Sequence, residues 1–160
     1  RDVFVLVGDG SWLMMSSEIV TAVQEGVKLT VVLIDNGGYA SIGGLSESLG
    51  SGGFGARAVR RGADGSLSGP PLEVDFAANA RSLGAEVIPA SDLRELEAAL
   101  EEARTRPGTV VIPIRIRPEP RVPSYDAWWD VPVAEVSEME SVRRAREAYE
   151  SARAAERWLV

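Results

Sequence analysis

The side chains best suited to hold a metal ion are those of Asp9 and Asn36. Asp9 lies between two glycines directly after an apolar run. Asn36, 27 residues further along, follows a second apolar run and precedes two glycines. A carboxylate, an amide oxygen and a freed backbone carbonyl are hard oxygen ligands, which suit Mg²⁺ or Ca²⁺ rather than zinc. Three protein oxygens are too few to enclose Mg²⁺, so phosphate oxygens and water would complete its coordination.

Glycines around this pair of side chains give a ligand access to the backbone. Gly8 and Gly10 permit a sharp turn, and Gly37 with Gly38 would free a carbonyl to face a metal. Ser11 stands at a predicted helix start, where free N–H groups and partial positive charge favour an anion. The two segments together therefore predict a metal-bridged phosphate or diphosphate.

The elements that must position these residues alternate between strands and helices. Because the carboxyl ends of neighbouring parallel strands share one crevice, Asp9 and Asn36 would meet there. The order strand, helix, strand, loop, helix, strand, helix, strand predicts an α/β fold with a doubly wound parallel sheet. The expected strands end at Gly8 or cover 29–34, 85–88 and 109–116; the expected helices cover 14–25, 72–83 and a segment that Ser91 caps and Pro107 stops.

Two further segments differ from this regular pattern. Residues 39–61 carry six glycines between Gly43 and Gly55 and predict a long polar loop next to the metal site, with Phe54 as its one large apolar side chain. Residues 118–132 are rich in proline and include Trp128 and Trp129, which need a surface to cover them.

The last segment predicts a helix. A capping box at Ser137 and Glu140 would start it, with Val142, Ala145, Tyr149, Ala152 and Leu159 on one face. We expect a diphosphate-binding α/β domain at 1–117 and a tail with a docked helix at 118–160.

Composition excludes several classes of protein. The chain has 160 residues, is 45% hydrophobic and carries a net charge of −7, which argues against a nucleic-acid or membrane surface. With no cysteine and no histidine, it can build neither a disulfide framework nor Ser-His or Cys-His catalysis. No apolar run approaches membrane-spanning length and no signal-peptide pattern is visible, so the cytoplasm is the expected location. A chain that opens directly on a strand also indicates a piece of a longer protein.

The segment Gly8-Asp9-Gly10, followed after 25 residues by Asn36, resembles the signature of thiamine-diphosphate enzymes. The resemblance implies that Asp9, Asn36 and the main-chain carbonyl of Gly38 hold Mg²⁺. Asp35 stands where the family usually has a first asparagine, which leaves the metal-ligand position intact. It also implies that thiamine diphosphate is held by residues Gly8, Gly10, Ser11, Asn36, Gly38, Tyr39 and Ala40.

Further motifs are similar to one branch of that family, which hydrolyses trihydroxycyclohexane-1,2-dione in myo-inositol catabolism. These motifs are Leu13-Met14-Met15, residues 24–26, 40–45 and 50–55, and the tail 124–137. This resemblance implies ring opening to 5-deoxyglucuronate, with thiamine diphosphate as electron sink. It also implies a homodimer or homotetramer in which a glutamate on the pyrimidine-binding domain of a neighbouring subunit activates the cofactor. This segment would then carry no catalytic residue and be inactive alone.

Other interpretations stay open. The nearest is another thiamine enzyme, such as an acetolactate-synthase-like carboligase or decarboxylase, which shares the anchor and differs in its substrate loops. One from another class is a non-catalytic Mg²⁺- and phosphate-binding α/β module. In a purely structural domain, Asp9 and Asn36 would be polar turn residues, which are common at strand ends.

Overall fold

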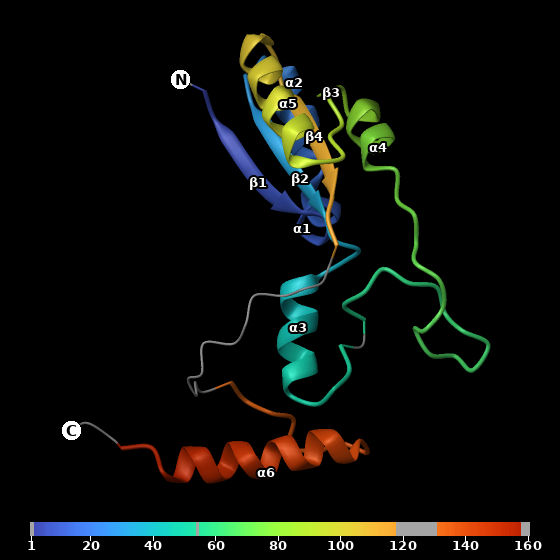
Figure 1. The fold of residues 1–160 in the computed structure, drawn as a ribbon, viewed down its shortest axis with the longest axis vertical. Helices are drawn as coiled ribbons and strands as arrows, with labels where there is room; N and C mark the ends of the chain where they lie inside the picture. The colour runs from blue at the N-terminus through green and yellow to red at the C-terminus, as the bar shows by residue number, and fades with distance from the viewer. Residues whose placement is uncertain (1, 54, 118–130, 158–160) are drawn as a thin grey trace. The chain divides into compact units, whose positions relative to one another are not determined.

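The structure is a computed structural model, and it describes residues 2–53, 55–117 and 131–157. Two compact units divide these residues: 2–39 with 58–117, and 40–57 with 131–157 (Figure 1). Residues 40–57, which the sequence analysis assigned to the first domain, make their contacts within the second unit. Phe54, Trp128, Trp129 and Leu159 lie outside the described residues, as do most residues of the proline-rich segment.

A four-stranded parallel sheet forms the centre of the first unit. Its strands are β1 (Phe4–Gly8), β2 (Thr30–Asp35), β3 (Glu86–Val87) and β4 (Val110–Arg115), in the order β1-β2-β4-β3. In the register of β1 on β2, Gly8 pairs with Ile34, so the two strands end side by side. This confirms the predicted parallel α/β sheet, and it puts the chain segments after both strands at one edge.

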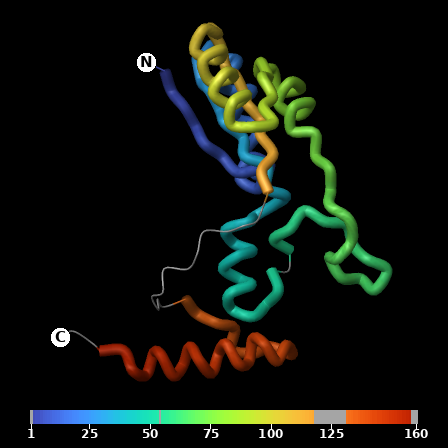
Figure 2. The backbone as a smooth tube through the Cα atoms, in the orientation of Figure 1, coloured from blue at the N-terminus to red at the C-terminus, as the bar shows by residue number. Residues whose placement is uncertain are grey.

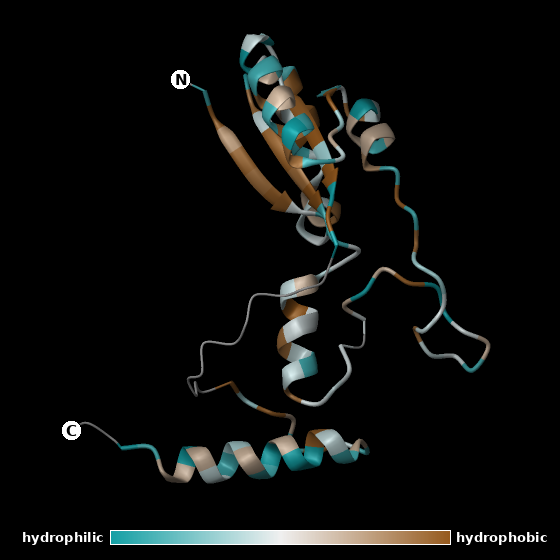
Figure 3. Cartoon of the chain, viewed as in Figure 1, coloured by the Kyte–Doolittle hydropathy of each residue, from teal (hydrophilic) through white to brown (hydrophobic). Residues whose placement is uncertain are grey.

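The two faces of the sheet are covered by different helices, as a doubly wound fold requires. Side chains alternate along each strand, so Leu33 packs on one face and Val32 on the other. Helix α5 (Leu93–Thr105) covers the face of Val32 with Ala99 and Ala103. The other face packs against α1 (Asp9–Met15), α2 (Glu18–Gln24) and α4 (Phe76–Ser82). Figure 3 shows the strands as the most hydrophobic part of this unit.

The single helix expected at 14–25 is wrong. The structure has two short helices, α1 and α2, which meet at Ser16 and Ser17. Of the expected apolar face only Ile19 is buried, while Met15 and Val23 are exposed. Serine hydroxyls compete for backbone hydrogen bonds, which favours helix ends over helix interiors and explains the break.

Aspartates cap the starts of two helices, and of these Asp75 was expected near its helix start while Asp92 was not. The helix expected at 72–83 begins only at Phe76, because the Asp75 carboxylate accepts from the N–H of Ala78. For α5, Asp92 is the N-cap in place of Ser91 and accepts from the N–H of Glu95 at 2.8 Å. Before α4, residues 58–72 run without a helix or strand (Figure 2) and are paired by hydrogen bonds such as that from Arg60 N–H to the carbonyl of Pro70.

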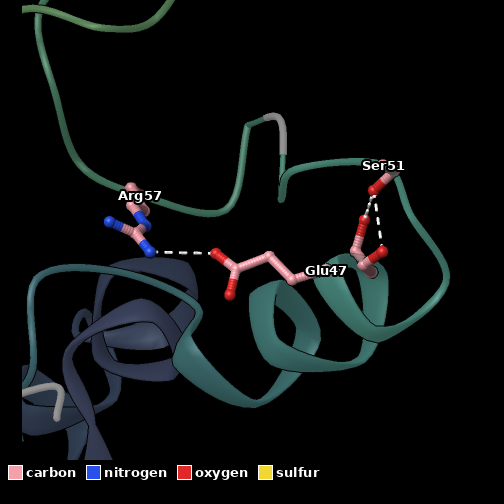
Figure 4. A network of polar contacts seen from close by, with 4 residues as sticks. Glu47, Ser51 and Arg57 are labelled. Atoms are coloured by element: carbon pink, nitrogen blue, oxygen red, sulfur yellow. Dashed lines mark hydrogen bonds and ion pairs between the residues drawn. The ribbon is translucent and has the colours of Figure 1, made fainter. Parts of the chain in front are cut away.

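The second unit contains the largest departure from the sequence analysis. Residues 40–48 form helix α3 (Ala40–Ser48), so the first half of the expected long loop is helical. The chain after α3 is held by an ion pair between Glu47 and Arg57 at 2.9 Å and by a hydrogen bond of Ser51 to Ser46 (Figure 4). A glycine-rich composition therefore did not mean an unstructured loop.

Helix α6 (Glu140–Ala154) packs within this second unit. Val142 and Tyr149 are buried together with Val133, which confirms the predicted apolar face at these positions. The capping box is wrong, because Met139 is the N-cap and Ser137 Oγ accepts from the Met139 N–H. No helix among the residues described is long and apolar enough to cross a membrane.

We predict that Gly50 is essential to the second unit because its positive φ of 86° is combined with a close approach. A Cβ there would lie 2.6 Å from the carbonyl oxygen of Ser141, whereas at Gly52, with φ of 68°, it would meet nothing within 4 Å. Gly52→Ala should cost about 1 kcal/mol for its backbone conformation, and Gly50→Ala a further 1–3 kcal/mol, roughly, for overpacking. Hydrogen exchange of residues 40–53 in the full-length protein measures both. Equal costs would contradict the packing of α6 on this segment.

Candidate functional site

Asp9 and Asn36 do meet, as the strand ends predicted. The Asp9 carboxylate accepts the N–H of Gly38 at Oδ2 (2.6 Å) and the N–H of Gly10 at Oδ1 (2.9 Å). The first of these hydrogen bonds joins the start of α1, directly after β1, to the turn after β2. Gly10 and Gly38, one from each of the two predicted segments, thus both donate to the Asp9 carboxylate.

The carboxamide of Asn36 closes the group. One of its terminal atoms lies 2.9 Å from the carbonyl oxygen of Gly38 and 3.0 Å from Oδ1 of Asp9. As nitrogen, this atom donates a hydrogen bond to each of these acceptors. As oxygen, it makes a set of three oxygens that share no proton and need a cation between them. A rotation of the amide by half a turn exchanges the two states.

Two of the separations in this group are compatible with Mg²⁺ as the bound ion. Ligands at about 2.1 Å in an octahedron are about 3.0 Å apart along its edges, and the two separations at Asn36 are 2.9 and 3.0 Å. The donor set is one carboxylate, one amide and one carbonyl, with no nitrogen or sulfur ligand. Among the residues described there is no group of three or more acidic, histidine or cysteine side chains that could hold a metal. The group around Asp9 therefore depends on neutral oxygens and on whatever a ligand supplies.

Burial makes the Asp9 carboxylate costly to ionise. Its side chain is 2% exposed, and burial raises its pKa, while the N–H groups of Gly38 and Gly10 lower it. The nearby carboxylate of Asp35 raises that pKa further. An ionised Asp9 is therefore held against a desolvation cost, which a bound cation would offset.

The two glycines after Asn36 adopt conformations that other residues avoid. Gly37 has φ of 81° and Gly38 has φ of 137°. These angles turn the chain so that Gly38 offers its N–H to Asp9 and its carbonyl to the carboxamide of Asn36. The carbonyl of Gly37 accepts from Ala58 N–H at 2.9 Å, which fixes the turn from the other side.

Gly10 is needed because Tyr39 covers it. A Cβ at Gly10 would lie 2.6 Å from Cδ1 and 2.8 Å from Cε1 of the Tyr39 ring. The sequence analysis gave both residues to the cofactor site but did not foresee this contact, since nothing in the motif relates the glycine to a residue 29 positions later. No atom comes within 4 Å of a Cβ built at Gly8.

The other residues expected at the site are placed as follows. Ser11 is exposed on α1, and Ala40 begins α3 in the second unit. Helix α1 already begins at Asp9, two residues before the expected start. Asp35 was noted only as a departure from the family pattern. The structure shows that it accepts from Gly37 N–H at 3.1 Å and lies 3.9 Å from Arg115 Nε.

Comparison with known proteins agrees with this geometry. Residues 1–114 match the family described as "Thiamine pyrophosphate enzyme, C-terminal TPP binding domain". The chain belongs to this family. Asp9, Asn36 and Gly38 all fall inside the matched part, and the cofactor of the family is thiamine diphosphate.

Curated relatives share one name. The chain is 42% identical over 151 residues to "3D-(3,5/4)-trihydroxycyclohexane-1,2-dione hydrolase" of Bacillus velezensis, and 41% identical over 150 residues to the protein of that name from Bacillus subtilis. Each match covers 94% of this chain and 23% of the relative. The chain thus spans about a quarter of the length of these relatives.

Solved structures agree on the fold. Benzoylformate decarboxylase from Polynucleobacter necessarius aligns with a TM-score of 0.60 and 28% identity, over 76% of this chain and 20% of that one. The thiamine diphosphate-dependent 4-hydroxybenzoylformate decarboxylase of Rhodococcus jostii RHA1 aligns with a TM-score of 0.58 and 21% identity, over 73% and 20% of the two chains. The sheet described here is therefore that of thiamine-diphosphate enzymes.

We predict that Gly10→Ala destabilises the cofactor-free protein by about 1–3 kcal/mol, because the new Cβ displaces the Tyr39 ring. Gly8→Ala is the matched control, since its Cβ meets nothing, and thermal melting compares the two. In a Tyr39→Ala background the cost of Gly10→Ala should shrink. An undiminished cost in that background would mean that Tyr39 is not the group displaced.

Proposed function

We propose that this chain is the diphosphate-anchoring part of a thiamine-diphosphate-dependent hydrolase that opens the ring of trihydroxycyclohexane-1,2-dione. The observation that carries the anchoring role is the convergence of Asp9, Asn36 and the Gly38 carbonyl, with oxygen separations that suit Mg²⁺. The substrate is proposed from the shared name of the relatives at 36–42% identity.

The residues of this chain would act by binding and orienting. Asp9 would supply one negative charge to Mg²⁺, and Asn36 and Gly38 would supply neutral oxygens. When bound, thiamine diphosphate supplies the electron sink for breaking a C–C bond. We propose that Gly8, Gly10 and Ser11 after β1, and Tyr39 and Ala40 after β2, line the diphosphate. With no histidine or cysteine, the chain can build neither Ser-His nor Cys-His catalysis, and we assign no catalytic residue to it.

The remaining parts of the site would come from elsewhere in the protein. We propose that an activating glutamate lies on a pyrimidine-binding domain of a neighbouring subunit in a homodimer or homotetramer. Exposed apolar side chains on β1 support a further covering partner: Phe4, Val5 and Leu6 are all exposed on the strand at the edge of the described sheet. The domain division 1–117 and 118–160 remains a proposal for the whole protein.

Turnover by the full-length protein tests the substrate. With thiamine diphosphate and Mg²⁺ present, we expect the cyclic dione to be consumed and a ring-opened acid to appear in chromatography. Parallel reactions with pyruvate and with benzoylformate test for carboligase and decarboxylase activity. Turnover of either of these without turnover of the dione would replace the proposed substrate and leave the anchoring role standing.

We predict that Asp9→Ala in the full-length protein weakens Mg²⁺-dependent binding of thiamine diphosphate by about 100-fold or more, because it removes the only charged protein ligand. The fold should persist, since the loss of two N–H acceptors is partly offset by removal of a buried charge. Calorimetry measures the affinity.

Asp92→Ala is the matched control for this change. It also removes a carboxylate that accepts a backbone N–H, but at the start of α5. We expect it to lower stability by about 1 kcal/mol and to leave the affinity unchanged. Unchanged affinity in Asp9→Ala would mean that this carboxylate only ties two turns together.

A further inference from the structure

Helix α1, which begins with Asp9, packs on the hydrophobic core through one large side chain, that of Trp12. It has seven residues, too few for a helix that is stable alone. Its buried residues are Asp9, Gly10 and Trp12, so Trp12 is the only large one among them. The next three residues, Leu13 to Met15, are each at least half exposed. The apolar packing of α1 on the sheet therefore comes from the Trp12 indole.

The indole is seated by packing and by one hydrogen bond. It packs in the cluster with Leu33 and Phe76, and its Nε1 donates to Oδ1 of Asn79 at 2.8 Å. An indole N–H is a donor only, so the oxygen of the Asn79 carboxamide must face it. Apolar packing is non-directional, whereas a hydrogen bond has a preferred direction and so restricts the orientation of the ring.

The acceptor is itself held in place. Asn79 lies on α4, whose start is fixed by the Asp75 cap and whose Phe76 and Ala80 are buried in the same cluster as Trp12. Asn79 is therefore a fixed point on the face of the sheet that α1 also covers.

We propose that the hydrogen bond from Trp12 to Asn79 positions the diphosphate site. Trp12 follows Asp9 by three residues, so the two side chains lie on one side of the helix, one turn apart. A shift of the indole would move α1 and with it the Asp9 carboxylate, which accepts from the Gly38 N–H at 2.6 Å and has its Oδ1 3.0 Å from the Asn36 carboxamide. Trp12 and Asn79 are thus positioning residues. The inference rests on the proposed role of Asp9 as a metal ligand.

The test measures affinity and stability separately in the full-length protein. Asn79→Leu keeps the size of the side chain and removes the acceptor, and Trp12→Phe keeps an aromatic ring and removes the donor. We expect each to raise the dissociation constant of thiamine diphosphate with Mg²⁺ by about tenfold in calorimetry, the size typical of changes behind a metal ligand. Asn79→Asp keeps an acceptor for the indole and should stay close to the wild type. The double variant Trp12→Phe/Asn79→Leu should bind no more weakly than the worse single variant, because both remove one interaction.

A matched control lies at the opposite end of the same sheet. Thr109, just before β4, is buried and donates through Oγ1 to the carbonyl of Val27 at 2.8 Å. Thr109→Val removes a hydrogen bond of the same length far from the carboxyl ends of the strands. It should lower the melting temperature of the cofactor-free protein and leave the affinity unchanged.

The outcomes separate the two proposals. Asn79→Leu and Trp12→Phe could instead bind within twofold of the wild type and melt at lower temperatures, as Thr109→Val does. The hydrogen bond would then only stabilise the fold. That result would overturn the positioning role and leave the anchoring role standing. A wild-type protein that does not bind thiamine diphosphate with Mg²⁺ would overturn the anchoring role and the inference together. A tenfold loss of affinity in Asn79→Leu and Trp12→Phe, together with an affinity close to that of the wild type in Asn79→Asp, supports both proposals.

Discussion

The hydrogen bond from the Gly38 N–H to the Asp9 carboxylate is the contact on which the site depends. It joins the start of α1, directly after β1, to the turn after the neighbouring parallel strand β2, across 29 residues of the chain. A buried carboxylate needs such partners, because burial without hydrogen bonds costs several kcal/mol, roughly. With Gly38 held by its N–H, its carbonyl is available to the carboxamide of Asn36. One interaction therefore fixes three oxygens at once.

The charges around these oxygens fit an anionic ligand bridged by a cation. Asp9 is the only charged member of the group, and Asn36 and Gly38 add oxygens without adding charge. Asp35 brings a second carboxylate near Asp9, but it pairs with Arg115 and accepts from Gly37 N–H. Mg²⁺ would add two positive charges, and a bound diphosphate would then leave the site net negative. A second carboxylate among the proposed ligands would increase that negative charge, so neutral oxygens suit the positions of Asn36 and Gly38.

The arrangement of the sheet and the pairing of Asp9 with Asn36 could be predicted because both follow from local patterns. Buried parallel strands need continuous apolar runs, and β2 is buried along Thr30 to Leu33. Polar residues after such strands must then share one edge. The contacts within the site could not be predicted in the same way, since the sequence gives no sign that Tyr39 covers Gly10 or that Trp12 meets Asn79.

The glycines of residues 43–55 show most clearly the limit of prediction from the sequence. Those between Gly43 and Gly55 suggested a loop, because glycine is usually a sign of backbone freedom. In the structure Gly43 is helical and buried, and a Cβ there would come 3.0 Å from the Cβ of Ala56. Gly50 and Gly52 have positive φ, and Gly50 is also packed against Ser141. The sequence alone does not distinguish a glycine that permits close packing from one that permits a turn, because only tertiary contacts differ between them.

The position of the Asp9 carboxylate also depends on tertiary contacts rather than on local helix propensity. A helix of seven residues contributes little stability of its own, so helix propensity cannot fix the position of Asp9, its first residue. The carboxylate is held from the front by Gly38, on the turn after β2, and α1 is held from behind by Trp12 against α4. These two contacts come from different elements and act on the same short helix. If the contact of Trp12 with Asn79 were weakened, the hydrogen bond from Gly38 to Asp9 could still form, but over a wider range of carboxylate positions. A metal that accepts oxygens only near one distance is sensitive to that range, whereas the stability of the fold is not.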